Sequence, residues 1–409
     1  MTAIGVRIAL FSAYFLFAIL LNSVGTVILQ SIVSFGVSKE DASILEAFKD
    51  LPIAAVSFLV ASLLPRLGYR RAMVIGFATV AGACLLMPLA PAFATAKILF
   101  FAIGASFALI KVSVYSTIGL LTDNSNKHAS FLNLIEGFFM LGVLAGYWVF
   151  AAFIDSANPA SLTWVNVYWL LSAVAAANVV ILLLAKFPKA PVSTAPGSGL
   201  LADFAAMFAL LWKPAVLVFV ISAFLYVLIE QGIGTWLPTF NNEVLHLPAA
   251  MSVQAASIYA LALAVGRLGA GVILRFIDWF WLLVICVAAM AALILLALPL
   301  ATGLEPDPEM SWLSAPLAAY VVPLIGLFMA PIYPAINSVI LSSLPRERHA
   351  AMAGLIVVFS ALGGTTGSFV TGRTFAAFGG ATAFYLSLVP MAAIMIALIV
   401  LKRLVRKPA

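Results

Sequence analysis

The sequence is poor in charged residues and in cysteine. Only 9% of its 409 residues are Asp, Glu, Lys or Arg, and 65% are hydrophobic, whereas a soluble domain is about 25% charged. One soluble core cannot bury such an excess of apolar side chains, so the composition indicates a polytopic membrane protein. The two cysteines, Cys84 and Cys286, lie in apolar runs, which excludes a disulfide framework and a cysteine metal site.

Sequence motifs of common enzyme classes are absent as well. There is no Gly-rich loop ending in Gly-Lys-Ser/Thr, no His/Glu zinc motif and no nucleophile elbow. None of the three histidines lies within an apolar run, so an intramembrane enzyme would lack the convergent side chains that it needs. We therefore expect no enzymatic activity, no cofactor and no metal. The net charge of +6 is explained by where the basic loop residues lie, and we expect no nucleic-acid partner.

Long apolar runs are what the sequence has in abundance. Only helices and closed barrels can span lipid, and unbroken runs of this length are typical of helices, because barrel strands alternate apolar and polar residues. The first run is long enough to span and lacks a small-residue cleavage site, so we do not expect a cleavable signal peptide. The runs predict twelve transmembrane helices, at 8–30, 44–64, 72–90, 97–121, 130–153, 164–186, 214–238, 251–274, 279–300, 315–341, 350–371 and 381–401.

Lysine and arginine are distributed unevenly among the predicted loops. If the N-terminus lies inside, the basic residues gather on the cytoplasmic side, and the outer loops hold only Lys39, Lys97 and Arg373. Cytoplasmic loops of membrane proteins carry such an excess of positive charge. We therefore expect a multi-pass protein of the bacterial inner membrane with both termini in the cytoplasm.

The two halves of the sequence share an internal repeat. Gly142 and Gly146 recur 221 residues later as Gly363 and Gly367, and other short matches share this offset or one residue more. Duplicated halves are typical of transporters built around a site at the bilayer midplane. Glycines at this spacing permit close helix contact, either as simple packing or at the place where the two halves meet or slide.

A change in composition separates the two halves. Residues 187–199 are rich in Pro, Gly and Ser, and an amphipathic stretch follows at 200–213, which together predict a linker. We therefore expect a six-helix bundle at 1–187, a cytoplasmic linker at 188–213 and a second six-helix bundle at 214–409. The predicted fold class is an all-α membrane protein of two bundles.

One lysine lies deep in an apolar run. Lys111 is near the middle of the predicted span 97–121, where a cation costs at least about 2.5 kcal/mol unless it is paired or faces water. Lipid offers nothing to offset that cost. We therefore expect Lys111 to face an internal cavity.

Three charged residues of the first half share one helix face. Glu46, Lys49 and Asp50 are spaced i, i+3, i+4 at the outer end of the second predicted span, so their side chains lie together. They are either the solvated start of a helix or the outward-facing part of a cavity wall.

Glu136 lies in the predicted helix after that of Lys111, and the two helices are antiparallel neighbours. An ion pair between Lys111 and Glu136 is one interpretation. In a functional interpretation, Lys111 attracts an anionic substrate and Glu136 competes for it. In another, Glu136, Asp50 or Glu46 accepts a proton and Lys111 favours the ionised carboxylate until substrate intervenes.

Several short motifs carry a family resemblance. They are Leu67-Gly68-Tyr69-Arg70-Arg71 between the second and third spans, Leu132-Asn133-Leu134 in the fifth, Gly266-Arg267 in the eighth and Tyr333-Pro334 in the tenth. They resemble the major facilitator superfamily, and more narrowly its fucose/galactose–proton symporter branch. The resemblance implies a central cavity lined by helices 1, 4, 7 and 10, and import of a small polar solute coupled to protons.

The sequence departs from that branch at two positions. Symporters of the branch use an acidic residue in helix 1 and another in helix 4. By the flanking residues these positions are Ser23 and Lys111, and neither is acidic. The usual proton-binding pair therefore cannot be carried over, and neither can the specificity for fucose.

Candidate substrate contacts follow from the cavity-lining helices that the resemblance implies. Glu230 and Gln231 lie in the polar, glycine-rich outer half of helix 7, and either bind the solute or form a structural hydrogen bond. Further candidates on helices 1, 4, 7 and 10 are Asn22, Tyr115, Tyr226, Tyr333 and Asn337.

Arginines near the cytoplasmic ends of helices are candidates for gating. Arg70 and Arg71 lie in the loop just before the third span, Arg267 lies near the inner end of the eighth, and Arg275 follows that span. They either bond helix C-termini when the inner side is closed or anchor the chain to lipid headgroups.

The combined prediction is a secondary active transporter that works by alternating access. Lys111 favours an anionic solute, such as a sugar acid or another organic anion, and proton coupling is expected from the resemblance. A neutral sugar–proton symporter and an exporter of an amphipathic compound are the alternatives. A receptor or structural membrane protein would not need the duplicated halves. We expect a monomer whose partners are its small-molecule substrate, protons and the lipid bilayer.

Overall fold

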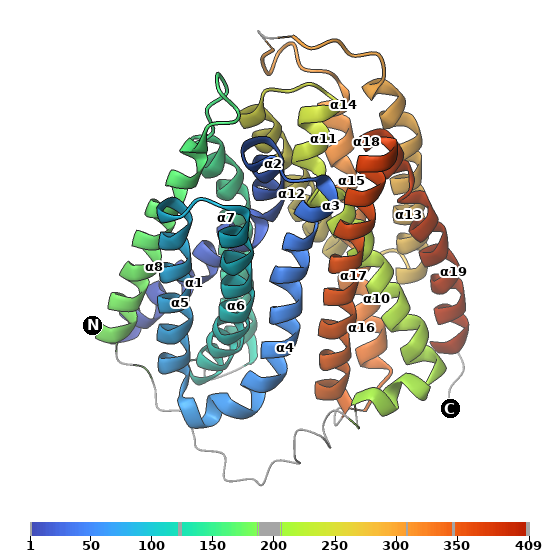
Figure 1. The fold of residues 1–409 in the computed structure, drawn as a ribbon. Helices are drawn as coiled ribbons and strands as arrows, with labels where there is room; N and C mark the ends of the chain where they lie inside the picture. The colour runs from blue at the N-terminus through green and yellow to red at the C-terminus, as the bar shows by residue number, and fades with distance from the viewer. Residues whose placement is uncertain are drawn as a thin grey trace. The chain divides into compact units, whose positions relative to one another are not determined.

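The computed structural model describes residues 2–121, 125–185, 187, 205, 207–307, 310–345 and 348–405, and within them all regular secondary structure is helical. The chain divides into two compact units (Figure 1). The first unit comprises Met1–Val37 and Leu45–Gly197, and the second comprises Ser38–Ile44 and Ser198–Ala409. Most of the predicted linker at 188–213 lies outside the described residues, so its boundaries stay a prediction.

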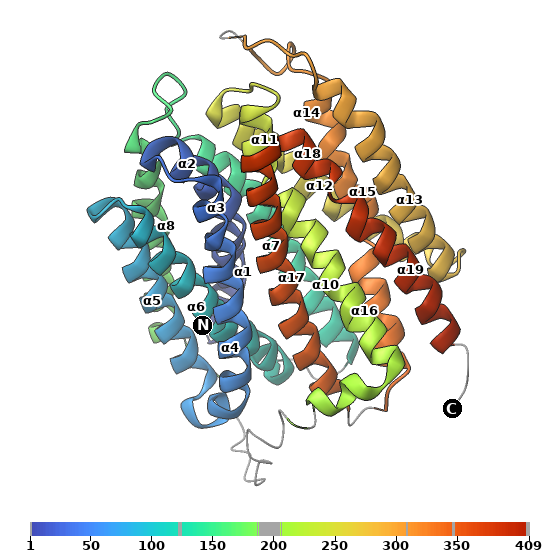
Figure 2. The ribbon, with the colours of Figure 1, turned by 45° about the vertical axis from the view of Figure 1, so that its right-hand side comes forward.

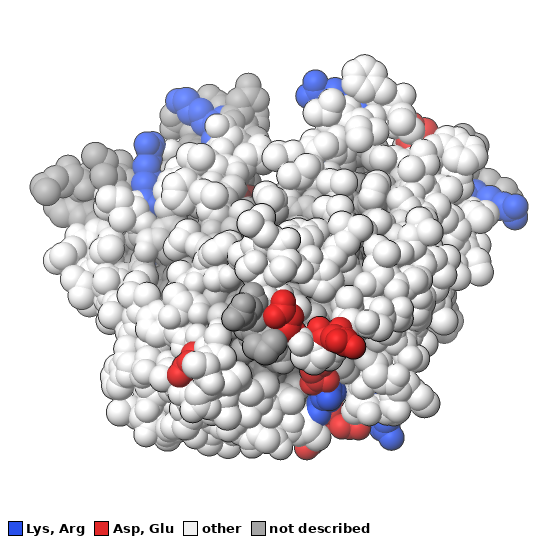
Figure 3. All heavy atoms as spheres, turned by 90° about the horizontal axis from the view of Figure 1, so that it is seen from above, with Lys and Arg blue, Asp and Glu red and all other residues white. Residues whose placement is uncertain are grey.

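Eleven helices of the described chain are long and apolar enough to cross a membrane. The predicted span at 44–64 forms a helix, α4 (Ile44–Leu67), but it is not one of the eleven. Its first two turns carry Glu46, Lys49 and Asp50. The number of twelve spans and the cytoplasmic location of the termini therefore stay predictions. Most of the surface in Figure 3 is uncharged, as expected for a chain with few ionisable residues.

The first unit is a bundle in which α5 packs against α6 and α8, and α1 packs against α7 and α8. Its helices are α1 (Thr2–Asn22), α2 (Val24–Phe35), α4, α5 (Tyr69–Leu89), α6 (Phe93–Leu121), α7 (Ser125–Ala151) and α8 (Val167–Leu184), with a short 3-10 helix at Leu162–Asn166.

The first predicted span, 8–30, is broken near its middle. α1 ends at Asn22 and α2 begins at Val24, with Ser23 between them. The buried Ser23 hydroxyl donates to the carbonyl oxygen of Leu20 at 2.8 Å. Serine side chains compete in this way for backbone acceptors and often bend helices. The break therefore lies at the residue that occupies the helix 1 acidic position of the symporter branch.

The second unit is built around α10, which packs against α17 and α19 (Figure 2). Its longer helices are α10 (Pro214–Gly234), α12 (Ala249–Ile273), α13 (Trp279–Ala297), α16 (Ile332–Ser342), α17 (His349–Phe378) and α19 (Leu388–Val405). Its shorter helices are α3 (Lys39–Ala42), α11 (Leu237–Glu243), α14 (Ala318–Val321), α15 (Ile325–Met329) and α18 (Gly380–Tyr385), with 3-10 turns at Leu210–Trp212, Leu298–Ala301 and Val322–Leu324.

The predicted span 315–341 consists of several short pieces instead of one helix. Pro331 lies between α15 and α16, where its missing N–H cannot continue the helical hydrogen bonds. Pro334, in contrast, lies in the first turn of α16. The N–H groups of a first turn have no partner within the helix, so this proline does not break it.

The repeated glycines pack helices together inside each unit. A Cβ added to Gly142 would lie 2.6 Å from the carbonyl oxygen of Phe15, so α7 touches α1 there. The corresponding atoms on Gly363 and Gly367 would lie 2.4 and 2.2 Å from carbonyl oxygens of α10. These contacts agree with the interpretation of the glycines as close packing between helices, since each glycine touches a helix of its own unit.

Candidate functional site

Lys111 lies in α6, and its side chain is exposed. Its Nζ is 5.8 Å from the ring centroid of Phe107 and 6.0 Å from that of Tyr115. These two rings lie one helical turn before and after the lysine, so they flank it along one face of α6. At this distance each ring stabilises the ammonium only weakly.

Glu136 is an exposed residue of α7, and its Oε1 accepts a hydrogen bond of 2.6 Å from the Tyr115 hydroxyl. No ion pair within 4.0 Å joins Lys111 to a carboxylate among the described residues. The predicted Lys111–Glu136 ion pair is therefore not formed in this structure. Tyr115 connects the two instead, because its ring faces the ammonium and its hydroxyl bonds the carboxylate.

Aromatic rings surround this polar trio. The ring of Tyr14 in α1 lies 6.2 Å from that of Tyr115 and 5.8 Å from that of Phe139 in α7. Phe139 in turn lies 6.3 Å from Phe107. Sequence analysis did not include Tyr14, Phe107 or Phe139. The i±4 spacing of Phe107 and Tyr115 about Lys111 was a usable signal, whereas the contribution of α1 and α7 depends on tertiary packing.

Glu46, Lys49 and Asp50 of α4 are buried, with relative exposures of 0, 5 and 8%. Lys49 forms a short ion pair with Glu46 and a second pair with Asp50, whose Oδ1 lies 3.5 Å from Nζ. The solvated helix start considered from the sequence is therefore wrong. α6 covers this turn closely, since a Cβ on Gly104 would lie 2.2 Å from the Lys49 carbonyl oxygen. Two carboxylates share one ammonium here, so the cluster carries one net negative charge when all three are ionised.

In the second unit, Glu230 of α10 is the centre of a polar cluster. The Tyr226 hydroxyl, one turn earlier, donates to its Oε1 at 3.0 Å. An Arg267 guanidinium nitrogen of α12 lies 4.0 Å from the same oxygen. Arg267, a gating candidate by its sequence position, therefore lies beside a predicted substrate-binding carboxylate.

Residues of α16 extend this cluster. The rings of Tyr226 and Tyr333 are stacked at 5.3 Å, and the Tyr333 hydroxyl is 2.8 Å from the hydroxyl oxygen of Ser360. Asn337 lies one turn further along α16, and its Oδ1 is buried without a hydrogen-bond partner in the described chain. Gln231 points elsewhere, because its Oε1 accepts from the Thr235 hydroxyl of the same helix.

Tyr259 of α12 is a positioning residue that sequence analysis missed. Its hydroxyl lies 3.4 Å from the Glu230 carbonyl oxygen and 3.1 Å from the Met329 sulfur. Its ring fits against Gly234 and Gly326, where an added Cβ would approach ring atoms within 2.8 and 2.9 Å. This fit holds the Glu230 turn of α10 against α12 and α15. Such packing between distant helices cannot be predicted from a local sequence pattern.

The remaining candidates lie apart from these clusters. The half-buried Asn22 donates to the Ala18 carbonyl oxygen of its own helix at 2.9 Å. Arg70 donates to the Leu182 carbonyl oxygen at 2.7 Å and to that of Leu183, at the C-terminal end of α8. A cation is favoured at a helix C-terminus. Arg71 and Arg275 are exposed. A gating role for any of these arginines stays a prediction.

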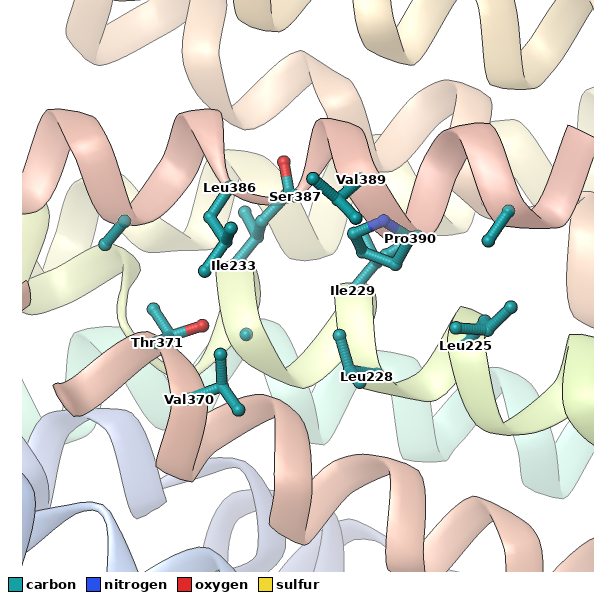
Figure 4. Close-up of a pocket in the computed structure, with 13 residues that line it drawn as sticks. Leu225, Leu228, Ile229, Ile233, Val370, Thr371, Leu386, Ser387, Val389 and Pro390 are labelled. Atoms are coloured by element: carbon teal, nitrogen blue, oxygen red, sulfur yellow. The ribbon is translucent and has the colours of Figure 1, made fainter. Parts of the chain in front are cut away.

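An apolar crevice of about 290 Å³ lies on another side of α10, where α10 meets α17, α18 and α19 (Figure 4). It is lined by Ile229 and Ile233 among other aliphatic side chains, and its few hydroxyls include that of Ser387, which donates to the Phe384 carbonyl oxygen. The crevice offers a polar solute no charged partner. We therefore treat the Lys111 cluster of the first unit and the Glu230 cluster of the second unit as two separate candidate sites.

The two clusters offer similar chemistry from different helices. Each contains one cation, one carboxylate and one tyrosine hydroxyl that donates to that carboxylate. Such a set can bind an anion at the cation, accept a proton at the carboxylate, and hydrogen-bond hydroxyl groups. No group of three His, Cys, Asp or Glu side chains suited to a metal occurs in the described part of the chain.

A family model described as Major Facilitator Superfamily matches residues 10–368. No curated protein matches the sequence significantly. Solved structures match it over nearly their whole length, at identities that establish the fold alone.

Three of these structures are of different transporters. The nucleoside transporter NupG has a TM-score of 0.72 at 15% identity, with 99% of this chain and 100% of that chain covered. The E. coli fucose:proton symporter FucP, in the outward conformation, has a TM-score of 0.62 at 18% identity, with 97% and 98% covered. A bacterial homologue of the human lysosomal transporter Spinster, inward-facing and unoccupied, has a TM-score of 0.69 at 15% identity, with 98% and 95% covered.

The buried cluster on α4 generates a stability prediction. Replacing Lys49 by Met keeps the apolar stem but leaves Glu46 and Asp50 buried without their shared cation. Breaking a buried pair in this way costs about 3–5 kcal/mol. We expect a much lower unfolding temperature for purified Lys49→Met in detergent, partly restored at low pH, where the carboxyl groups are protonated.

The control is Lys97→Met, which removes a half-buried lysine of α6 that contacts the ring of Phe93. We expect its unfolding temperature to stay close to that of the wild type. Equal unfolding temperatures for Lys49→Met and Lys97→Met at neutral pH would contradict the buried ion-pair cluster.

Proposed function

Because the chain belongs to the Major Facilitator Superfamily, we propose that this membrane transporter moves a small organic anion by alternating access, together with protons. The substrate class, the coupling ion and the roles of individual residues are parts of this proposal.

The observation that carries the proposal is the state of Lys111. It is an exposed cation in a membrane-spanning helix, with two ring faces beside it and no carboxylate within 4.0 Å among the described residues. A cation at such depth persists where it faces water or a counter-ion, and within membranes such residues mark substrate and ion pathways. An anionic group of the solute would supply the missing partner.

Glu136 provides a reason for proton coupling. Its carboxylate lies near Lys111 through Tyr115, so when ionised it repels an anion that approaches the lysine. A proton on Glu136 removes this repulsion and leaves the full charge of Lys111 to the substrate. Proton and anion then stabilise each other's binding, which is the reciprocal coupling that symport requires.

The α4 cluster supports a second proton site. Its three ionisable side chains are buried and paired with one another, and Glu46 or Asp50 is a candidate to bind a proton there. A buried charge whose protonation changes with conformation biases the equilibrium between two states. In this proposal, Lys111 and Glu136 recognise the substrate. The α4 cluster binds or releases a proton as the conformation of the helices changes.

The Glu230 cluster of the second unit is a separate candidate for binding a polar solute. Tyr226, Glu230, Tyr333 and Asn337 offer hydroxyl, carboxylate and amide groups beside a stacked pair of rings. The same set supports the second candidate, a neutral sugar–proton symporter, because sugar hydroxyls bind such groups. The two candidates differ in whether Lys111 contacts the solute.

Replacing Lys111 by Ala tests the anion site. In proteoliposomes with an imposed proton gradient, we expect uptake of radiolabelled anions from a panel of D-glucuronate, D-lactate and benzoate at limiting concentration to fall at least about tenfold, equivalent to about 1.4 kcal/mol. Lys111→Arg should retain more uptake than Lys111→Ala, because it keeps the positive charge.

Lys97→Ala is the matched control, since it removes another cation of α6. D-Fucose is the neutral probe. Wild-type uptake of an anion that Lys111→Ala does not reduce would contradict the proposal. Uptake of D-fucose alone, insensitive to Lys111→Ala, would favour the neutral-sugar candidate.

Replacing Glu136 by Gln tests the proposed coupling. Glutamine can still accept from Tyr115, but it cannot be protonated. We expect anion exchange between equal internal and external pools to continue. A pH gradient should no longer drive the internal anion concentration above the external one. In the wild type an uncoupler should abolish accumulation, and gradient-driven accumulation by Glu136→Gln at the wild-type level would contradict the role of Glu136.

A further inference from the structure

One segment of the chain belongs to the second unit although its neighbours on both sides belong to the first. This segment, Ser38–Ile44, is called the strap below, and it contains the short helix α3. Ser38 caps α3, because its Oγ accepts from the Asp41 backbone N–H at 3.0 Å and its hydroxyl donates to Asp41 Oδ2 at 2.8 Å. The strap therefore has a defined local structure and is not a slack connection.

The first contact of the strap is electrostatic. Lys39 Nζ lies 3.0 Å from Oε2 of Glu243, the last residue of α11, and 5.5 Å from the ring centroid of Phe375 in α17. Both ion-pair side chains are partly exposed, at 23 and 31%. A pair of this kind contributes little net stability, so it is suited to forming and breaking repeatedly.

The second contact is a close fit at the other end of the strap. The Ser368 hydroxyl of α17 lies 3.3 Å from the Ser43 carbonyl oxygen, and the Trp236 indole N–H donates to the Ser368 carbonyl oxygen at 3.0 Å. A Cβ added to Gly372 would lie 2.9 Å from the Cβ of Ser43. Two separate points therefore hold the strap on α17.

The covalent connections leave the strap little room to stretch. α4 begins at Ile44, directly after Ser43. On the other side, α2 ends at Phe35 and is capped by Gly36, whose φ of +65° is the left-handed conformation that favours glycine. A rearrangement that moves α2 and α4 relative to α17 must therefore carry the strap along and break its contacts, or leave it in place and bend the chain at Gly36.

We propose that the strap is a reversible latch, docked on α11 and α17 in one state of the cycle and released in the other. This inference rests on the proposed alternating access, which requires that some contacts differ between states. Release of the strap moves the start of α4, which carries Glu46, Lys49 and Asp50 within its first two turns. The latch thereby connects docking on the second unit to the buried charge cluster.

The test measures the docked fraction of the strap directly and needs no substrate. Cysteines replace the exposed residues Glu40, in the strap, and Ala377, in α17, in a background where Cys84 and Cys286 are Ala. Both carry nitroxide spin labels, and pulsed electron paramagnetic resonance in liposomes gives the distribution of distances between them. We expect a short docked population and a longer released one.

Charge reversal of the ion pair must shift these populations. In Lys39→Glu and in Glu243→Lys, the ratio of docked to released strap should fall about two- to fivefold, the range that an exposed ion pair supplies. The double variant Lys39→Glu/Glu243→Lys should restore it. Arg373→Glu, which reverses an exposed charge elsewhere on α17, should leave the ratio unchanged.

A single short distance in all variants would overturn the latch and identify the strap as a fixed cap. An equal shift caused by Arg373→Glu would overturn the role of the ion pair. If Lys39→Glu does not fold, Lys39→Gln replaces it with the same expected direction. Because the readout is independent of uptake, a failure of the anion-transport proposal would not imitate either result.

Discussion

The cost of placing a charge in hydrocarbon governs this structure. Each ionised group within a helix of the bundles needs a partner, water or a solute. Lys49 meets this requirement with two carboxylates in a buried cluster, and Glu230 meets it with a tyrosine hydroxyl and a nearby arginine. Lys111 differs from both, because two ring faces lie beside its ammonium and no carboxylate of the described residues lies within 4.0 Å of it. This difference is the basis of our proposal that Lys111 binds an anionic substrate.

The location of Lys111 within a long apolar helix and the shared face of Glu46, Lys49 and Asp50 could be predicted from the sequence. Both follow from helix periodicity and apolar run length, which are local properties. The burial of the three α4 residues could not be predicted, because it depends on α6 packing closely at Gly104. Likewise, spacing suggests that Glu136 lies near Lys111, but only the packing of α6 on α7 decides that Tyr115, and not Lys111, bonds it.

The membrane-spanning helices were predictable because the thickness of the bilayer sets the number of apolar residues that a spanning helix needs. The breaks within the helices were only partly predictable. Pro331 signals one, whereas the break at Ser23 depends on a serine hydroxyl that competes for a backbone carbonyl. The contacts of Arg267 and of the strap show most clearly which features cannot be predicted from the sequence. The partners of Arg267 and Lys39 lie 37 and 204 residues away in sequence, and no local pattern encodes such contacts.

The central claim is that the Lys111 ammonium faces water inside the protein. The most direct test converts Lys111 to Cys, in a background without Cys84 and Cys286, and exposes intact membranes to 2-aminoethyl methanethiosulfonate, which restores an ammonium on the side chain. We predict that the cysteine reacts from water and that a bound anion from the uptake panel slows the reaction. A folded Lys111→Cys protein that stays unmodified, while Lys97→Cys is labelled under the same conditions, would contradict the account.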